Sequence, residues 1–269
     1  MAIKCAFVNQ KGGVGKTTSC ICIAYTIQAL LKKRVLVIDT DGQCDTTIFF
    51  GAKTEDQETM LDVFCGDNVD VHHAVQHCTY GDVIASEPDV YNVPERLAEA
   101  GKDSVLILKE RLAVLEDEYD FIFVDCPPGN PKILMNVFAY VDTAIVVVQG
   151  SGFDLRGFMN MVQMTYLPIK ENVNPNLSIA GILNCMTQPQ TNKSKRMLQS
   201  LNEIAAKLGT SMFETSIRRS VKVEEALCEL NVPLLEYDLA NTAQLDYEDV
   251  INELMERLGL PDRANPYRN

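Results

Sequence analysis

The stretch of sequence that decides the fold is residues 3–18, IKCAFVNQKGGVGKTT. Its first six residues are mainly apolar and have the length of one strand. A run that is apolar on both faces is typical of a parallel sheet covered by helices on each side. After the glycine-rich turn, apolar residues recur at spacings of three and four, which predicts a helix over residues 16–31. The stretch therefore predicts a strand, a loop and a helix in succession.

The same alternation of strand-length and helical patterns continues along the chain. Further strands are predicted at residues 34–39, 121–125, 144–149 and 180–184. Further helices are predicted at residues 103–118, 152–168, 192–208 and 242–258. The segments between the strands are long enough for helical crossovers, so we predict an α/β fold, a mainly parallel twisted sheet with helices on both faces. We expect one domain over residues 1–269, in which the stretch from about 50 to 102 is the least regular part.

The composition is that of a globular protein with a strong acidic excess. Hydrophobic residues make up 46% and charged residues 23% of the 269 positions, which excludes wholesale disorder. The chain has 24 Lys and Arg against 37 Asp and Glu, a net charge of −13. Taken alone, that charge argues against nucleic acid or an acidic membrane as a partner, because both are negatively charged.

The nine cysteines indicate a reducing compartment. They include no CxxC pair and no regular spacing, so we interpret them as reduced thiols. The first apolar run is too short for a signal peptide, and no stretch approaches the length of a membrane helix. We expect a cytoplasmic protein.

The glycine-rich turn has the features of a phosphate-binding loop. Gly12, Gly13 and Gly15 let backbone N–H groups turn inward, towards a ligand at the positive end of the following helix. Lys16 would reach the terminal phosphates, and the Thr17 hydroxyl would ligate magnesium. Gln10 stands where the common P-loop pattern has its first glycine. The expected nucleotide-binding residues of this loop are Lys11, Gly12, Gly13, Val14, Gly15, Lys16, Thr17 and Thr18.

Three aspartates follow or end predicted strands at the same edge of the sheet. Asp39 and Asp125 each end an apolar run, and Asp41 lies just beyond the first of these. Ligands of open parallel sheets bind at the carboxyl ends of strands, and magnesium prefers oxygen ligands. Asp41 is placed to orient a water towards a γ-phosphate. Any one of them alone could equally be a solvated or helix-capping aspartate. The expected metal-site residues are Thr17, Asp39, Asp41 and Asp125.

These segments together resemble a known family. Residues 11–17 (KGGVGKT), 39–43 (DTDGQ) and 119–128 (YDFIFVDCPP) resemble the deviant Walker A, DxDPQ and Walker B segments of the ParA/Soj partition ATPases. The similarity continues through residues 103–150 and 217–238, and only about 50–102 is weakly matched. Gly42 and Cys44 depart from the pattern, which usually has proline and glycine there. The resemblance implies a three-layer P-loop NTPase fold, with ATP and Mg²⁺ as cofactors.

The resemblance also implies roles for individual residues. It implies an ATP-dependent homodimer in which Lys11 crosses to the partner subunit's phosphates while Lys16 serves its own. Asp41 would then orient the attacking water, and Asp125 would hold magnesium through water, which makes Lys11, Lys16 and Asp41 the expected catalytic residues. Asn184, at the end of a predicted strand, is our candidate for the adenine contact, although asparagine is also common where a strand gives way to a loop.

The basic residues are concentrated in one segment. Residues 186–222 contain seven basic and two acidic residues, a local net charge of +5, which leaves −18 on the rest of the chain. The resemblance implies non-specific DNA binding by the ATP dimer, and Arg219 matches an arginine implicated in it. Lysine and arginine contacts to phosphate supply such sequence-independent affinity. The alternative is a solvated helix face. The candidate DNA-binding residues are Lys193, Lys195, Arg196, Arg218, Arg219 and Lys222.

The expected function is an ATP-hydrolysing switch that segregates a plasmid, chromosome or mobile element. A ParB-like centromere-binding protein is the expected stimulating partner, and the ATP-bound form would be nucleoid-associated. We expect no helix-turn-helix domain before residue 3. A protein cargo stays open. A MinD-like membrane-associated switch is disfavoured, because residues 246–258 (DYEDVINELMERL) are acidic rather than basic and amphipathic.

His73 and His77, together with His72 the only histidines, lie four residues apart, the spacing of two zinc ligands on one helix face. We favour a surface helix with chance histidines, because no second ligand pair lies at a recognisable spacing.

Overall fold

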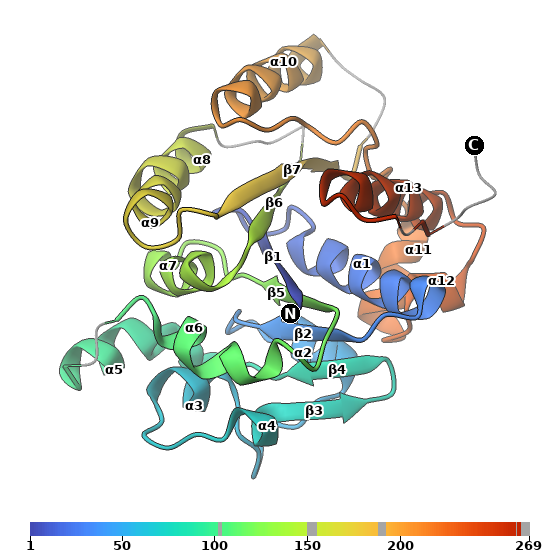
Figure 1. The fold of residues 1–269 in the computed structure, drawn as a ribbon. Helices are drawn as coiled ribbons and strands as arrows, with labels where there is room; N and C mark the ends of the chain where they lie inside the picture. The colour runs from blue at the N-terminus through green and yellow to red at the C-terminus, as the bar shows by residue number, and fades with distance from the viewer. Residues whose placement is uncertain (102–103, 150–154, 188–191, 262, 265–269) are drawn as a thin grey trace.

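A single mixed sheet organises the computed structural model, which describes all residues except 102–103, 150–154, 188–191, 262, 265–269 and the side chains of 192–195. Within the described residues the strand order is β3-β4-β2-β5-β1-β6-β7 (Figure 1). The parallel strands are β1 (Ile3–Val8), β2 (Val35–Asp39), β4 (Gly81–Ile84), β5 (Phe121–Asp125), β6 (Thr143–Gln149) and β7 (Ser178–Cys185). All five predicted strands are therefore confirmed.

The sheet ends in a hairpin that the apolar pattern did not predict. β3 (Val75–Cys78) pairs antiparallel with β4, and both strands are short. Gln76 and His77 interrupt the apolar pattern of β3, because an edge strand is not covered on both faces. Asp82 interrupts the pattern of β4. An antiparallel edge on an otherwise parallel sheet is common in doubly wound folds.

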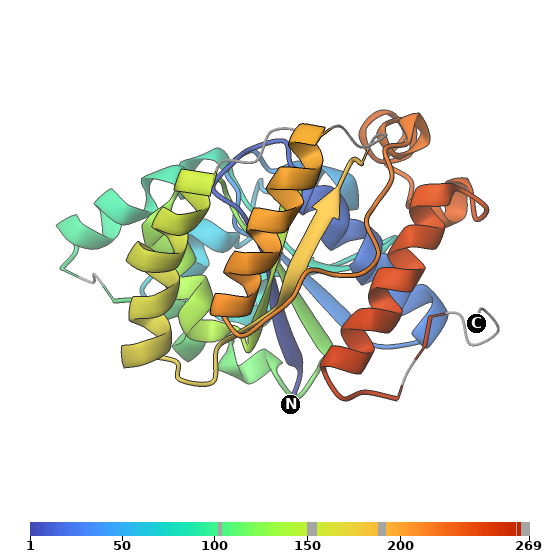
Figure 2. The same cartoon turned by 90° about the horizontal axis from the view of Figure 1, so that it is seen from above.

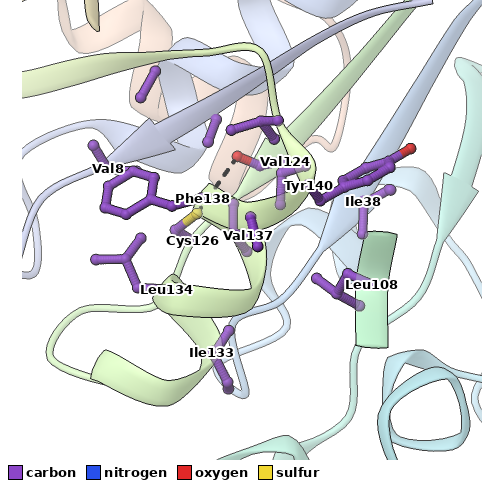
Figure 3. Close-up of a cluster of buried hydrophobic side chains, with 14 of the residues drawn as sticks. Val8, Ile38, Leu108, Val124, Cys126, Ile133, Leu134, Val137, Phe138 and Tyr140 are labelled. Carbon is purple, nitrogen blue, oxygen red and sulfur yellow. Dashed lines mark hydrogen bonds between the residues drawn. The ribbon is translucent and has the colours of Figure 1, made fainter. Parts of the chain in front are cut away.

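Helices cover both faces of the sheet and create two hydrophobic cores (Figures 1 and 2). Successive strand residues point to opposite faces, so Ala6 and Val8 enter one core while Phe7 enters the other. Figure 3 shows the first core, where Phe138 and Leu134 pack beneath the strands. This burial on both faces explains why the central strands have nearly continuous apolar sequences.

The helices on the side of the first core are α3 (Met60–Cys65), α5 (Val93–Glu99), α6 (Ile107–Leu112), α7 (Pro131–Tyr140), α8 (Leu155–Met161), α9 (Leu167–Asn172) and α10 (Asn192–Lys207). On the second side lie α1 (Lys16–Leu31), α2 (Asp45–Phe50), α12 (Leu234–Tyr237) and α13 (Thr242–Arg257). The remaining short elements are α4 (Val71–Ala74), α11 (Val221–Glu224), the 3-10 helices η1 (Pro88–Asn92) and η2 (Ala113–Leu115), and the π-helices η3 (Val162–Tyr166) and η4 (Glu225–Glu229).

Three of the predicted helices, those over 16–31, 192–208 and 242–258, are confirmed to within about one residue. The one predicted over 103–118 is shorter, since α6 gives way to the 3-10 turn η2 and residue 103 lies outside the described residues. The one predicted over 152–168 is divided into α8, the π-helix η3 and α9, and its first three residues also lie outside the described part.

α7 was not predicted, although its start carries a recognisable signal. Pro131 occupies its first turn, and the Asn130 side chain accepts a hydrogen bond from the Ile133 N–H at 3.3 Å. Proline at the first position and asparagine before it are typical of a helix start.

The interpretation of the histidines as one surface helix is wrong. α4 ends at Ala74, so His73 is helical while His77 lies on β3, where its Nδ1 is 2.7 Å from Asp82 Oδ1. The two rings thus do not share a helix face. In the described part of the chain, no three His, Cys, Asp or Glu side chains are grouped to hold a metal ion.

Candidate active site

The glycine-rich loop joins the end of β1 to the start of α1. Gly13 and Gly15 have φ values of +69° and +97°, in the left-handed region that favours glycine. Gly15 directly precedes α1, so the loop closes over the amino end of a sixteen-residue helix, whose first N–H groups lack helical partners. This end of the helix fits an anionic ligand.

The two lysines of the loop occupy different environments. Lys16 is buried, and its Nζ donates to the Lys11 carbonyl oxygen at 3.4 Å, while the Lys11 residue is exposed. Asn9 ties the loop to the sheet: its Oδ1 accepts from the Lys11 N–H at 3.0 Å, and its Nδ2 donates to the Val147 carbonyl at 2.6 Å. Sequence reasoning gave Asn9 no role of its own. Lys16 thus points into the loop, whereas Lys11 lies at its outer edge.

Asp39 and Asp125 lie opposite each other in the register of β2 and β5. Asp39 is fully buried and both of its carboxylate oxygens accept hydrogen bonds: Oδ1 from the Asp41 N–H at 3.0 Å, and Oδ2 from the Thr47 N–H at 2.9 Å and hydroxyl at 2.7 Å. These bonds link the loop after β2 to the first turn of α2. The sequence pattern did not predict that Thr47 donates hydrogen bonds to Asp39.

Asp125 keeps one buried oxygen without a partner. Its Oδ2 accepts from the Thr46 hydroxyl at 2.8 Å, while Oδ1 has no hydrogen bond in the described structure. A buried polar atom without a partner is uncommon and costs free energy. Oδ1 therefore suits a water molecule in the shell of a cation, with the Thr17 hydroxyl as a direct ligand, since both are hard oxygen donors.

Burial perturbs both carboxyl groups. The pKa of Asp39 is raised, first by removal from water and then by the charge of Asp125. The pKa of Asp125 is also raised by burial, against the lowering effect of the Thr17 and Thr46 hydroxyls and the Lys16 ammonium. Burial thus disfavours the charged form of both carboxyl groups, and a bound cation would favour it.

The Asp41 side chain is held by hydrogen bonds although it lies beyond the strand. Its Oδ1 accepts from the Gln43 N–H at 3.0 Å and from the Tyr91 hydroxyl at 2.8 Å. Asp41 is only 8% exposed. Tyr91 comes from η1, in the segment that the sequence comparison matched weakly, so its contact was not predicted.

Asn184 is buried at the end of β7, and its carbonyl accepts from the Ile217 N–H at 2.9 Å. The next residues, Cys185 and Met186, line a cavity of about 130 Å³ together with Thr18 of α1. Asn184 thus directly precedes two residues that line this cavity, and its contact with adenine stays a prediction.

The structure divides the candidate DNA residues between two places. Arg196 is exposed on α10, where Lys193 and Lys195 have side chains outside the described part, whereas the others lie just before or in α11 (Figure 1). Two of these others are engaged in ion pairs and thus carry compensated charges: Arg218 binds Asp246 of α13 through Nε at 2.9 Å and Nη2 at 2.6 Å, and Lys222 pairs with Asp238.

Arg219 differs from these neighbours. Its side chain is exposed and forms no ion pair with any residue that the structure describes. An exposed guanidinium without a carboxylate partner keeps its full charge for an anion. Arg219 is therefore the candidate DNA-binding residue whose described environment best suits a phosphate contact.

Comparison with known proteins identifies the family. The family model described as an AAA domain matches residues 2–179. The chromosome partitioning protein ParA of Caulobacter vibrioides is 30% identical over 257 residues, which cover 94% of this chain and 93% of that protein. The chain belongs to the ParA/Soj family of partition ATPases. The sporulation initiation inhibitor protein Soj of Bacillus subtilis is 28% identical over 261 residues, covering 93% and 96% of the two chains.

A solved structure places this ParA/Soj-family chain in its fold class. Cobyrinic acid a,c-diamide synthase from Mycobacterium smegmatis, with a bound ATP analog and magnesium, has a TM-score of 0.81 and 21% identity over 100% of both chains. This likeness confirms the three-layer P-loop NTPase fold. The name of that protein denotes a different activity, so the fold alone does not select the substrate.

Replacing Asp125 with Asn should stabilise the protein without nucleotide while removing its place in the metal site. We expect Asp125→Asn to raise the free energy of unfolding at pH 8 by on the order of 1 kcal/mol, because the amide buries no charge. The raised pKa values of Asp39 and Asp125 mean that the folded state binds protons more tightly than the unfolded state. The stability of the parent therefore falls as the pH rises from the ordinary aspartate pKa of 3.8 through the raised pKa values of these two groups. Urea unfolding without magnesium should show that the free energy of unfolding falls less between pH 5 and pH 8 in the variant than in the parent.

Asp120→Asn is the control, since the Arg34 N–H lowers the pKa of this half-buried aspartate and its titration ends below that range. An Asp125→Asn variant that loses as much stability as the parent between the two pH values would contradict the argument.

Proposed function

We propose that this ParA/Soj-family chain is an ATPase that hydrolyses ATP with Mg²⁺ at the carboxyl edge of its sheet. The observation that carries the proposal is the meeting there of three groups: buried Lys16, an Asp125 oxygen that has no hydrogen-bond partner among the described residues, and the hydrogen-bonded carboxylate of Asp41. These are the charge-neutralising, metal-holding and water-orienting groups that phosphoryl transfer requires.

The chain's own residues bind and orient the nucleotide. Backbone N–H groups of residues 11–17 would hold the phosphates, and Thr17 and Asp125 would hold a magnesium ion. Bound magnesium supplies neutralisation of phosphate charge. We assign Asp39 to ordering the loop, since its two oxygens already accept three hydrogen bonds. Asn184 contacts the adenine.

In this proposal, hydrolysis depends on Asp41 and Lys16 of one subunit and on Lys11 of the other. Asp41 accepts a hydrogen bond from the attacking water, and Lys16 stabilises the charge that develops on the phosphate oxygens. Lys11, at the exposed edge of the loop, serves the nucleotide of the partner subunit in an ATP-dependent homodimer. The exposure of Lys11 and the burial of Lys16 support this division of roles.

Substitutions of Asp41 and Lys16 test the proposal. Asp41→Ala should bind ATP with unchanged affinity and lose turnover by about 100-fold or more, the scale of a lost acid–base or positioning group. Lys16→Ala should weaken ATP binding itself. Nucleotide binding measured by fluorescence and phosphate release at saturating ATP separate the two effects. Normal hydrolysis by Asp41→Ala, or unchanged ATP binding by Lys16→Ala, would reject the assigned roles.

We further propose that the ATP dimer binds DNA without sequence preference and so segregates a plasmid, chromosome or mobile element. The exposed Arg219 and the basic segment that contains it support this proposal, while the acidic remainder disfavours DNA binding by one subunit. A dimer presents two such segments to one duplex, so ATP controls DNA affinity. A ParB-like protein is the proposed stimulating partner, with the cytoplasm and nucleoid as the location.

A MinD-like membrane switch is less well supported. α13 packs its apolar residues Val250, Ile251 and Leu254 in the core, so this acidic helix presents no apolar face to a bilayer. Within the residues that the structure describes, none of the helices is both long and apolar enough to cross a membrane. A protein cargo remains the second candidate, since it would use the same switch.

Charge reversal at Arg219 tests the DNA proposal. Arg219→Glu should weaken ATP-dependent DNA binding by about tenfold or more and reduce the slope of log affinity against log salt by about one per lost phosphate contact. Fluorescence anisotropy with a short duplex at several salt concentrations measures both. Lys109→Glu makes the same change in net charge and is the control, since Lys109 is an exposed residue of α6, which lies far from α11 in Figure 1. Equal effects of the two variants would show that only overall charge matters.

A further inference from the structure

One side chain from outside the motifs contacts the loop after β2. Tyr91 of η1 is 37% exposed, and its hydroxyl donates to Asp41 Oδ1 at 2.8 Å while accepting from Gln43 Nε2 at 3.2 Å. It thereby joins two residues of the DTDGQ segment.

The contact depends on the absence of a side chain at Gly42. A Cβ placed there would lie 2.6 Å from Cε2 and 2.7 Å from Cδ2 of the Tyr91 ring, and 3.1 Å from the Pro88 carbonyl oxygen. Distances below 3.0 Å require one group to move. Gly42 and Tyr91 are therefore complementary, and the proline of the DxDPQ pattern would place a Cβ against the Tyr91 ring.

Hydrogen bonds also connect the chain just before η1 to the catalytic edge. The Ser86 N–H donates to the Thr47 hydroxyl oxygen at 2.8 Å, and that hydroxyl donates to Asp39 Oδ2 at 2.7 Å. Val90 of η1 is fully buried in the first core. The element that carries Tyr91 is thus positioned relative to β2 independently of the Tyr91 hydroxyl itself.

We propose that Tyr91 is a positioning residue for ATP hydrolysis, which acts by fixing the orientation of the Asp41 carboxylate. This inference rests on the proposed ATPase function. The Gln43 N–H and the Tyr91 hydroxyl both bind Oδ1, and together they set the direction in which Oδ2 faces. A water oriented by Asp41 is then presented in one direction. Without the hydroxyl, the carboxylate rotates about its χ2 bond, and fewer bound waters are correctly aligned.

The test is steady-state ATP hydrolysis by Tyr91→Phe, which removes only the hydroxyl. We expect about a tenfold lower kcat, the equivalent of about 1.4 kcal/mol of transition-state stabilisation, with KM for ATP unchanged. Tyr237→Phe is the matched control: Tyr237 is also 37% exposed, and its hydroxyl donates to Glu225 Oε2 at 3.0 Å on another part of the surface. It should keep the parental kcat.

A substitution at Gly42 tests the same contact between Tyr91 and Asp41. Gly42→Ala displaces the Tyr91 ring, so it should lower kcat by a similar factor, and the Gly42→Ala/Tyr91→Phe double variant should be no slower than the slower single variant. Multiplied effects, an unchanged or raised kcat of Tyr91→Phe, or an effect confined to KM would overturn the proposal. The ATPase function itself fails only if the parent does not hydrolyse ATP or if Asp41→Ala hydrolyses it normally, so the two failures are distinguishable.

Discussion

Asp39 and Asp125 are buried side by side at the carboxyl ends of two neighbouring parallel strands, and the polar architecture of this edge follows from that constraint. Two carboxylates in a region of low dielectric need hydrogen-bond donors or a cation. Thr47 and the Asp41 backbone donate hydrogen bonds to Asp39, whereas one oxygen of Asp125 has no partner within the part of the chain that the structure describes. Both carboxylate oxygens of Asp39 therefore accept hydrogen bonds, whereas the described residues provide a hydrogen bond to only one oxygen of Asp125.

The partly compensated Asp125 carboxylate fits the proposed nucleotide-driven switch. In the proposed ATPase, a cation that binds at this edge would favour the charged carboxylates, so binding of a metal–nucleotide complex would be linked to the stability of the edge. The same hydrogen bonds that satisfy Asp39 extend to Ser86 and place η1, which brings Tyr91 to Asp41. Structural support and catalytic positioning therefore share one network, and a change at Thr47 affects both.

The charge distribution has to be considered at the level of the fold as well as the sequence. Residues 186–222 are basic, but ion pairs with Asp246 and Asp238 compensate Arg218 and Lys222. The usable positive surface is smaller than the local charge of +5 indicates, and Arg219 is its best-defined member. In the proposed DNA-binding dimer, weak attraction by a single subunit would let the second subunit decide whether DNA is bound.

The sequence by itself determined the fold class and the phosphate-binding loop. Both depend on local patterns: continuous apolar strands buried on two faces, and glycines at positive φ before a helix that begins at Lys16. The family followed from the same motifs, because Lys11, Asp41 and Asp125 stand at fixed positions relative to strand ends. Only the tertiary structure decided the pairing partners of those residues. Tyr91 lies 50 positions from Asp41, in a segment with no regular pattern, and Asp246 lies 28 from Arg218. Contacts between distant segments arise from packing of the whole chain, and no local pattern of residue types records them.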